Sequence, residues 1–341
     1  MPNMLKSRIG TVPVDSGYRD DNYWIWGSSV VKGDDGLYHM YVSRWSRKLP
    51  FHVAWMTDCE IAHAVSETPC GPYRFSDVAL EKRGAQYWDG QSCHNPKIYR
   101  HKDKYILYYM GSTHPFESLP ESRLPDTTSK HCIVGRANKR IGIAVADSPY
   151  GPWERYDAPV LPTKPNTFYS FLTSNPSPVI HDDGSVLLMF KARAYEGHVH
   201  GHMTIGLAKA THYTGPYEVI SEEPLFGPDK MGEIEDPSIW LDADGYHMLA
   251  KDMGDSLCGE HHAGILLHSS NGIDWKLDED PLAYSRNITY DNGEEFCFGQ
   301  LERAFPLVED GKVTTLFFAA MDGPGGFNNG TKTWNVAIPL K

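Results

Sequence analysis

Three carboxylic acids of this chain are candidates for proton-transfer chemistry because of where they stand. Asp236 follows Glu235 and precedes Pro237 at the start of an apolar run, although strand interiors are usually depleted in Asp and Pro. Glu302 is expected to occupy the position that corresponds to Asp236 at the start of another such run, and Asp89 lies just before a third. Carboxyl groups that share a site can divide the roles of acid and base, because like charges raise the pKa of one of them.

A repeated pattern of strands and turns must position these acids. Each repeat opens with an apolar run, continues through a turn that mostly contains Asp-Gly into a second apolar run, and ends on a third run followed by a turn. Gly-Pro forms that last turn at 71–72, 151–152 and 215–216. Asp-Gly between apolar runs predicts a hairpin. The opening runs are 26–32, 94–100, 175–181, 235–241 and 302–308.

Five such repeats predict an all-β fold, a five-bladed β-propeller whose four-stranded antiparallel blades surround a central channel. The whole chain, 1–341, is then one domain. Its blades span approximately 24–80, 88–160, 170–225, 233–283 and 299–341. The last repeat is short, so the N-terminal segment is expected to close the ring. A β-sandwich with chance repeats is the alternative.

The starts of the inner strands and the long loops after the second strands face the same end of such a propeller. Variable loops on one rim of a rigid scaffold usually carry binding chemistry. Proline at a strand start fixes the direction of the residue before it. We therefore expect a funnel there, with these substrate-binding candidates: His94, Asn95, Asn175, Glu235, Trp88, and the strand-end cations Arg44, Arg193 and Lys251.

Composition excludes several classes of function. The net charge of −12 argues against a nucleic-acid partner, which needs a basic surface. No run of 18 apolar residues is present, so no membrane span is expected. The start lacks the apolar core of a secretory signal, which predicts a cytoplasmic protein, or a periplasmic or secreted one whose signal has been removed. The six cysteines form no CxxC pair and are expected to be reduced.

The propeller pattern and the acid–Pro motif at 235–237 resemble glycoside hydrolases of family 43 and the related families 117, 32 and 62. The WMNDPNG signature of family 32 is absent, and Gly27-Ser28 stands where family 43 has an aspartate. The resemblance implies a glycoside hydrolase with an inverting mechanism. The long loops around the funnel favour an exo-acting enzyme that releases a terminal sugar from an oligosaccharide. The resemblance also implies Asp89 as base, Asp236 as the carboxylate that tunes the acid's pKa, and Glu302 as acid, with base and acid exchangeable.

Several alternatives stay open. The scaffold also suits a glycoside phosphorylase or transferase, or a carbohydrate-binding propeller without catalysis. No cofactor is expected, although a divalent cation in the channel, held by His94 or by residues 259–263, is an alternative, and so is a dimer. For the acids, the structural alternatives are a strand-start cap for Asp236, an ion pair with Arg303 for Glu302 and a turn for Asp89. Trp24, Trp26, Trp45, Trp55 and Trp88 either stack on sugars or pack between blades.

Overall fold

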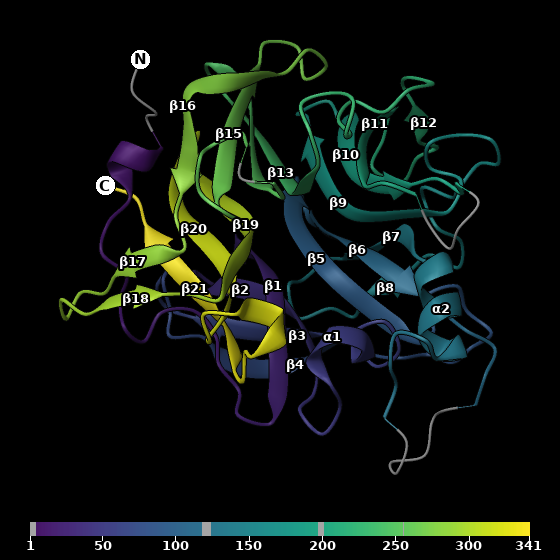
Figure 1. The fold of residues 1–341 in the computed structure, drawn as a ribbon, viewed down its shortest axis with the longest axis horizontal. Coiled ribbons are helices and arrows are strands. Elements are labelled where there is room, and N and C mark those ends of the chain that lie inside the picture. The colour runs from purple at the N-terminus through teal and green to yellow at the C-terminus, as the bar shows by residue number, and fades with distance from the viewer. Residues whose placement is uncertain (1–4, 118–123, 197–200, 255) are drawn as a thin grey trace.

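The computed structural model describes residues 5–117, 124–196, 201–254 and 256–341. Its strands form five antiparallel sheets arranged in a ring (Figure 1), which confirms the predicted propeller. The first four sheets have four strands each. In chain order they are β1 (Tyr23–Lys32), β2 (Tyr38–Ser46), β3 (Glu60–Ser66), β4 (Arg74–Leu80); β5 (Ser92–His101), β6 (Lys104–Ser112), β7 (Arg140–Ala146), β8 (Glu154–Arg155); β9 (Leu172–Ile180), β10 (Val186–Arg193), β11 (Thr204–Ala210), β12 (Glu218–Val219); β13 (Ile234–Asp242), β14 (Gly245–Asp252), β15 (Gly264–Ser269), β16 (Lys276–Tyr284).

The fifth sheet contains β19 (Gln300–Glu309), β20 (Lys312–Met321) and β21 (Thr333–Pro339). The N-terminal segment runs along its outer edge without forming a regular strand. The Gly10 amide donates to the Pro339 carbonyl at 3.0 Å, and the Asn335 amide donates to the Tyr18 carbonyl at 2.9 Å. The two ends of the chain are therefore joined beside this blade. A small hairpin of β17 (Asn287–Thr289) and β18 (Glu295–Cys297) precedes the sheet.

The core is divided among the interfaces between neighbouring blades. Between the fifth and first blades, for example, Phe305 and Phe317 pack in one buried cluster with Ile25 and Val42. Similar clusters join each of the other neighbouring pairs of blades. Burial of apolar side chains on both faces of each sheet is the main favourable term that holds the ring together.

Every inner strand bulges at one residue near its start. That residue has a positive φ: 51° at Gly27, 54° at Asn95, 48° at Asn175, 56° at Asp236 and 59° at Arg303. The pairing with the neighbouring strand shifts register at each of these positions. Gly, Asn and Asp adopt this left-handed conformation most readily. We call these five equivalent residues the neck ring.

The positions of the neck-ring residues show that the alignment of blades 4 and 5 expected from the sequence was wrong by one residue. Asp236 and Glu302 were expected to occupy corresponding positions. Instead Asp236 corresponds to Arg303, while Glu302 corresponds to Glu235, one residue earlier on its strand. The motif was misleading because blade 5 has Ala304 where blade 4 has Pro237.

Short helices occur in the loops between second and third strands. Helix α1 (Phe51–Ala54) lies between β2 and β3, and helix α2 (Lys130–Ala137) lies between β6 and β7. The Ser129 side chain caps α2 by accepting a hydrogen bond from the Cys132 amide, as expected for an N-cap serine. Single 3-10 turns occur at Lys6–Arg8 and Gly326–Asn328. Among the described residues, the helices are too short and too polar to cross a membrane.

Candidate active site

A cavity of about 210 Å³ opens at the starts of the inner strands. Its lining includes Trp26, Trp45 and Trp55 together with Phe51 and Phe327. We call this cavity the funnel. Trp24 does not line it; its indole donates to the Leu49 carbonyl at 2.8 Å. Aromatic rings in a polar cavity offer flat apolar faces of the kind that pack against sugar rings.

Three acids meet at the base of the funnel. Glu235, Asp236 and Glu302 each offer a carboxylate oxygen, and these oxygens lie within 4.8 Å of one another. Glu235 and Glu302 line the funnel itself. Asp236 instead lines the narrower channel cavity, together with Gly27, Asn95 and other residues of the inner strands. The predicted meeting of Asp236 and Glu302 is therefore present, and Glu235 joins them.

The surroundings of Glu302 favour its protonated form. Its side chain is 2% exposed, and Oε2 accepts a hydrogen bond from Lys251 Nζ at 3.2 Å. Oε1 is buried and has no partner among the described residues. Burial, assisted by the negative charge of Asp236, raises the pKa of Glu302 in spite of Lys251. A protonated Glu302 could donate from Oε1 to a ligand in the funnel.

The pKa of Glu235 shifts in the opposite direction, although its side chain is also largely removed from solvent, at 14% exposed. It forms an ion pair with Lys191. Burial by itself would raise the pKa of Glu235, but the positive charges of Lys191, Arg303 and Lys251 lower it strongly. Glu235 is therefore ionised. Two neighbouring carboxyl groups whose pKa values move apart are the usual signature of a divided acid–base site.

Asp236 is held within the neck ring. Its Oδ1 accepts hydrogen bonds from Asn175 Nδ2 at 2.5 Å and Arg303 Nη1 at 2.8 Å. Asn95 Nδ2 in turn donates to Asn175 Oδ1 at 2.8 Å. Burial raises the pKa of Asp236, and Arg303 opposes that rise. Asp236 thus places a carboxylate next to Glu235 and Glu302, and Arg303 partly neutralises its charge.

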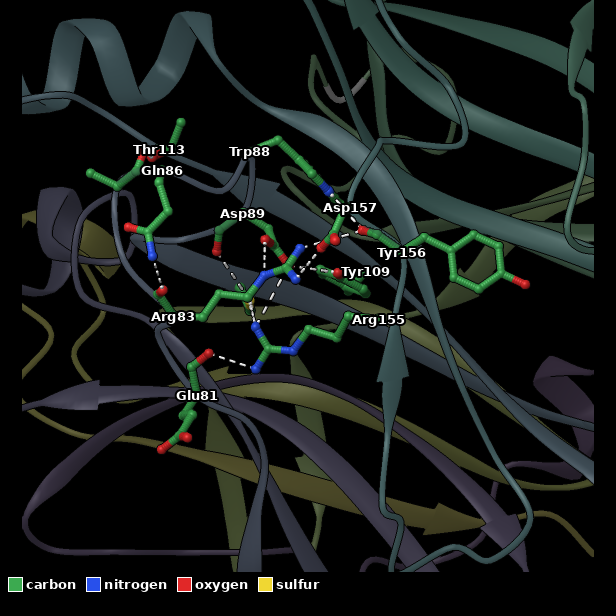
Figure 2. Close-up of polar contacts among 12 residues, drawn as sticks. Glu81, Arg83, Gln86, Trp88, Asp89, Tyr109, Thr113, Arg155, Tyr156 and Asp157 are labelled. Atoms are coloured by element: carbon green, nitrogen blue, oxygen red, sulfur yellow. Dashed lines mark hydrogen bonds and ion pairs between the residues drawn. The ribbon is translucent and has the colours of Figure 1, made fainter.

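Asp89, expected to be the base, lies elsewhere (Figure 2). Its fully buried carboxylate accepts from Arg83 Nε at 2.6 Å and the Tyr109 hydroxyl at 2.7 Å, and Arg155 Nη1 lies 3.6 Å away. It does not line the funnel. The structure therefore corrects this expectation: Asp89 is the buried anion of an ion-pair network, because Arg83 from the preceding loop and Arg155 from β8 converge on it.

Trp88 belongs to the same network. Its indole Nε1 donates to the Tyr156 carbonyl at 3.0 Å, and its ring stacks on Tyr109 with centroids 5.6 Å apart (Figure 2). Trp88 is not part of the funnel lining. The expectation that it binds substrate is thus corrected as well.

The three cationic side chains predicted to bind substrate differ in what they contact. Arg44 lies outside the funnel, where its Nε donates to Glu60 Oε1 at 2.8 Å. Lys251 donates hydrogen bonds to Glu302 and Gln300. Its positive charge favours the ionised form of Glu302. Arg193 does line the funnel, and its Nη1 donates to the Gly201 carbonyl at 2.6 Å.

The predicted polar residues of the second inner strand do reach the funnel. His94 and Asn95 line it, as does Asn175 from the third blade. The His94 ring stacks on Trp55 with centroids 5.1 Å apart, and Nδ1 contacts Cys59 Sγ at 3.2 Å. Burial lowers the pKa of His94 well below its ordinary value. His94 is therefore a neutral side chain with one nitrogen free of the Cys59 contact.

Sequence reasoning missed four funnel cations. Arg303 and Lys191 adjoin the acids, and Arg136 and Lys139 come from helix α2 and the residues just after it. Arg303 could have been found from its place next to Glu302. Lys191 could have been found from its place on β10, two residues before Arg193. Arg136 and Lys139 could not, because α2 is brought over the funnel by packing of the loop and not by the strand repeat.

A divalent cation does not fit the three acids. Glu235, Asp236 and Glu302 are already paired with Lys191, Arg303 and Lys251, respectively. Lys97 also lines the channel cavity beside Asp236, and burial lowers its pKa to about 7. Hard cations prefer oxygen ligands whose charge is not already neutralised. Here lysine and arginine side chains already neutralise the three carboxylates.

Known structures share this architecture. A family 117 glycoside hydrolase from Zobellia galactanivorans superposes with a TM-score of 0.65 at 19% identity, over 94% of this chain and 85% of that one. A GH43_1 enzyme from Xanthomonas citri, complexed with xylotriose, gives 0.61 at 14% identity, covering 99% and 92%. This chain has the fold of the five-bladed glycoside hydrolases.

The same propeller is found in a GH32 β-fructofuranosidase of Bombyx mori. The TM-score is 0.62 at 13% identity, with 99% of this chain and 63% of that chain covered. No family model matches the sequence, and no curated protein matches it. The likeness to the glycoside hydrolases is therefore one of fold, and it agrees with the resemblance inferred from the sequence.

Proposed function

We propose that this protein is an exo-acting glycoside hydrolase that releases a terminal sugar from an oligosaccharide. Glu302 serves as the general acid and Glu235 as the second carboxylate. The observation that carries the proposal is their pairing at the base of an aromatic funnel. Burial raises the pKa of Glu302, whereas cations lower the pKa of Glu235. Glycoside cleavage needs one protonated and one ionised carboxyl group.

The spacing of the acids supports a retaining mechanism. One carboxylate oxygen of each acid lies within 4.8 Å of one of the other acid, and such close oxygens favour the short carboxyl separation of retaining pairs, ~5–5.5 Å, over the ~6.5–9.5 Å of inverting pairs. Glu302 would give its proton to the glycosidic oxygen while the C1–O bond breaks and Glu235 bonds to C1. Glu302 would then take a proton from water, which attacks C1 and releases Glu235. This departs from the inversion that the family resemblance implies.

The dimensions of the funnel support attack at a chain end. Its volume of about 210 Å³ is below the roughly 300–1,000 Å³ of pockets for drug-sized ligands. Such a cavity suits a single sugar ring. Helices α1 and α2 both bring residues to its wall, among them Phe51 and Arg136, so a continuous polysaccharide has little room to cross.

Phosphorolysis is a second candidate because the funnel carries an excess of positive side chains. Arg136, Lys139 and Arg193 could receive inorganic phosphate in place of the attacking water. Turnover that requires inorganic phosphate and yields a sugar phosphate would favour it over hydrolysis.

The test is a panel of oligosaccharides and aryl glycosides, assayed for released sugar with and without phosphate. Proton NMR of the first-formed anomer then gives the stereochemistry. We expect phosphate-independent release from the non-reducing end with retention. Glu302→Gln and Glu235→Gln should each remove the activity, and Glu295→Gln, at an exposed position on β18, should keep it. A panel without any cleavage would favour the carbohydrate-binding alternative.

A further inference from the structure

One wall of the funnel is cationic. Arg136 on α2, Lys139 just after it and Arg193 at the end of β10 all line the cavity. The acids Glu235 and Glu302 stand on β13 and β19. The funnel therefore presents positive side chains from the second and third blades and carboxyl groups from the fourth and fifth.

Lys139 is the most unusual of these cations. It is 7% exposed, and its Nζ lies 4.1 Å from the centroid of the Trp55 ring. Within the described part of the chain, the Lys139 ammonium makes neither a hydrogen bond nor an ion pair. Burial, together with the positive charges of Lys191 and Arg136, lowers the pKa of Lys139 well below its ordinary value. Buried lysines are normally paired, so this position is costly in the empty protein.

The acids of the site do not supply the missing anion. Glu235 is paired with Lys191, and Glu302 accepts from Lys251. Asp236 is paired with Arg303 and lines the channel cavity. Arg136 stands close enough to Arg193 for that guanidinium to lower its pKa. Mutual repulsion among like charges is relieved when an anion enters.

We propose that the sugar bound in the funnel carries an anionic group, a ring carboxylate or a sulfate ester, which is received by Lys139 with Arg136 and Arg193. This inference rests on the proposed function and names its substrate class. The geometry places recognition of the anion on one wall and the acid pair on the other. A uronate or sulfated terminal sugar would then span both, whereas a neutral sugar would leave the Lys139 ammonium buried without a counter-charge.

The test is isothermal titration calorimetry with matched sugars. The probes are glucuronate against glucose, galacturonate against galactose, and galactose 6-sulfate against galactose. The proteins are the wild type, Lys139→Met, Lys139→Arg and a control, Lys312→Met, at the exposed start of β20. We expect at least one anionic sugar to bind more tightly than its neutral partner. Lys139→Met should weaken that binding about 10- to 100-fold, Lys139→Arg should largely restore it, and the control should match the wild type.

Misfolding is not expected to obscure the result. Methionine has a similar length and removes an unpaired buried charge, so the Tm of Lys139→Met should equal or exceed that of the wild type. Neutral-sugar affinity should fall much less than anionic-sugar affinity in this variant. If Lys139→Met weakens neutral and anionic sugars equally, Lys139 is a packing residue and the proposal is wrong.

Three further outcomes separate this inference from the proposed function and from binding of free phosphate. Cleavage of neutral glycosides only, with no preference for anionic sugars, would overturn the anionic substrate class and leave the hydrolase intact. Lys139-dependent binding of an anionic sugar without cleavage would support the anion site and count against hydrolysis. Inorganic phosphate that binds with the same Lys139 dependence, while no anionic sugar binds, would show that the anion is free and not borne by the sugar.

Discussion

Arg303 and Asp236 occupy equivalent positions on neighbouring inner strands and are ion-paired to each other. Arg303 Nη1 lies 2.8 Å from Asp236 Oδ1, and both residues have a left-handed backbone, with φ of 59° and 56°. Arginine is not a residue that favours this conformation. The neck ring therefore accepts an uncommon residue at a position from which its guanidinium pairs with Asp236 next to the acid pair.

Removal of Arg303 should destabilise the protein by leaving a buried carboxylate without its partner. We expect Arg303→Gln to lower the free energy of unfolding by about 3–5 kcal/mol at neutral pH, as measured by chemical denaturation. Adding Asp236→Asn should recover part of the loss. The control is Arg100→Gln, which breaks an exposed pair with Asp34 and should cost about 1 kcal/mol at most. Equal losses for Arg303→Gln and the control would contradict this account.

Glu235 should behave as a nucleophile. Replacing it with Gln removes the group that bonds to C1, so we expect turnover to fall by two orders of magnitude or more, on the order of other losses of a catalytic group. For an aryl glycoside and the truncated variant Glu235→Ala, azide should restore activity by attacking C1 from the vacated position. The product would be a glycosyl azide of inverted configuration, detected by NMR. Full activity of Glu235→Gln without azide would exclude this role.

Glu302 should make stability fall as pH rises. Its pKa is raised in the folded protein, so between the ordinary glutamate pKa of about 4.3 and the folded value the native state binds more protons than the unfolded state. Stability therefore decreases with pH through that window and levels off above it. Glu302→Gln should remove the decrease, so its stability relative to the wild type should be greater at pH 7 than at pH 4. The reverse order would mean that the pKa of Glu302 is lowered.

Asp89 should matter for folding and not for catalysis. Asp89→Asn leaves the half-buried Arg83 and Arg155 side chains without their shared, fully buried anion (Figure 2), and we expect a loss of about 3–5 kcal/mol. Activity per folded molecule should be retained. Asp157→Asn breaks only the exposed side of the same network, where Arg83 Nη1 meets Asp157 Oδ1 at 2.7 Å, and should cost no more than about 1 kcal/mol. A normally folded but inactive Asp89→Asn would restore Asp89 as a candidate base.

The propeller could be predicted from the sequence because its signals are local. Asp-Gly hairpins and Gly-Pro turns recur in step with apolar runs, and each repeat needs its neighbours to bury those runs. The bulge in each inner strand was not predicted. The positive φ values of Asn95, Asn175 and Asp236 are compatible with their residue types. Arginine rarely has a positive φ, so the residue type of Arg303 does not indicate a bulge. The alignment of Glu302 with Asp236 was therefore wrong by one residue.

Site residues were predicted correctly from the sequence only where they lie at the starts of inner strands. His94, Asn95, Glu235 and Glu302 reach the funnel because the repeat places them there. Asp89 was misplaced because its partner Arg155 is brought to it from β8 by tertiary packing, which no spacing in the sequence reveals. Lys139 was missed for a similar reason, since the position of α2 over the funnel depends on how its loop packs and not on the strand repeat.

The central claim is that Glu302 donates a proton to the leaving group. The most direct test compares wild type and Glu302→Gln on two glycosides of the same sugar, one with an alkyl and one with a 4-nitrophenyl leaving group. A nitrophenolate needs little protonation, whereas an alkoxide needs it fully. We predict that Glu302→Gln lowers kcat/KM for the alkyl glycoside by about 10²–10⁴-fold and for the nitrophenyl glycoside far less. An equal loss on both substrates would contradict the assignment of Glu302 as the acid.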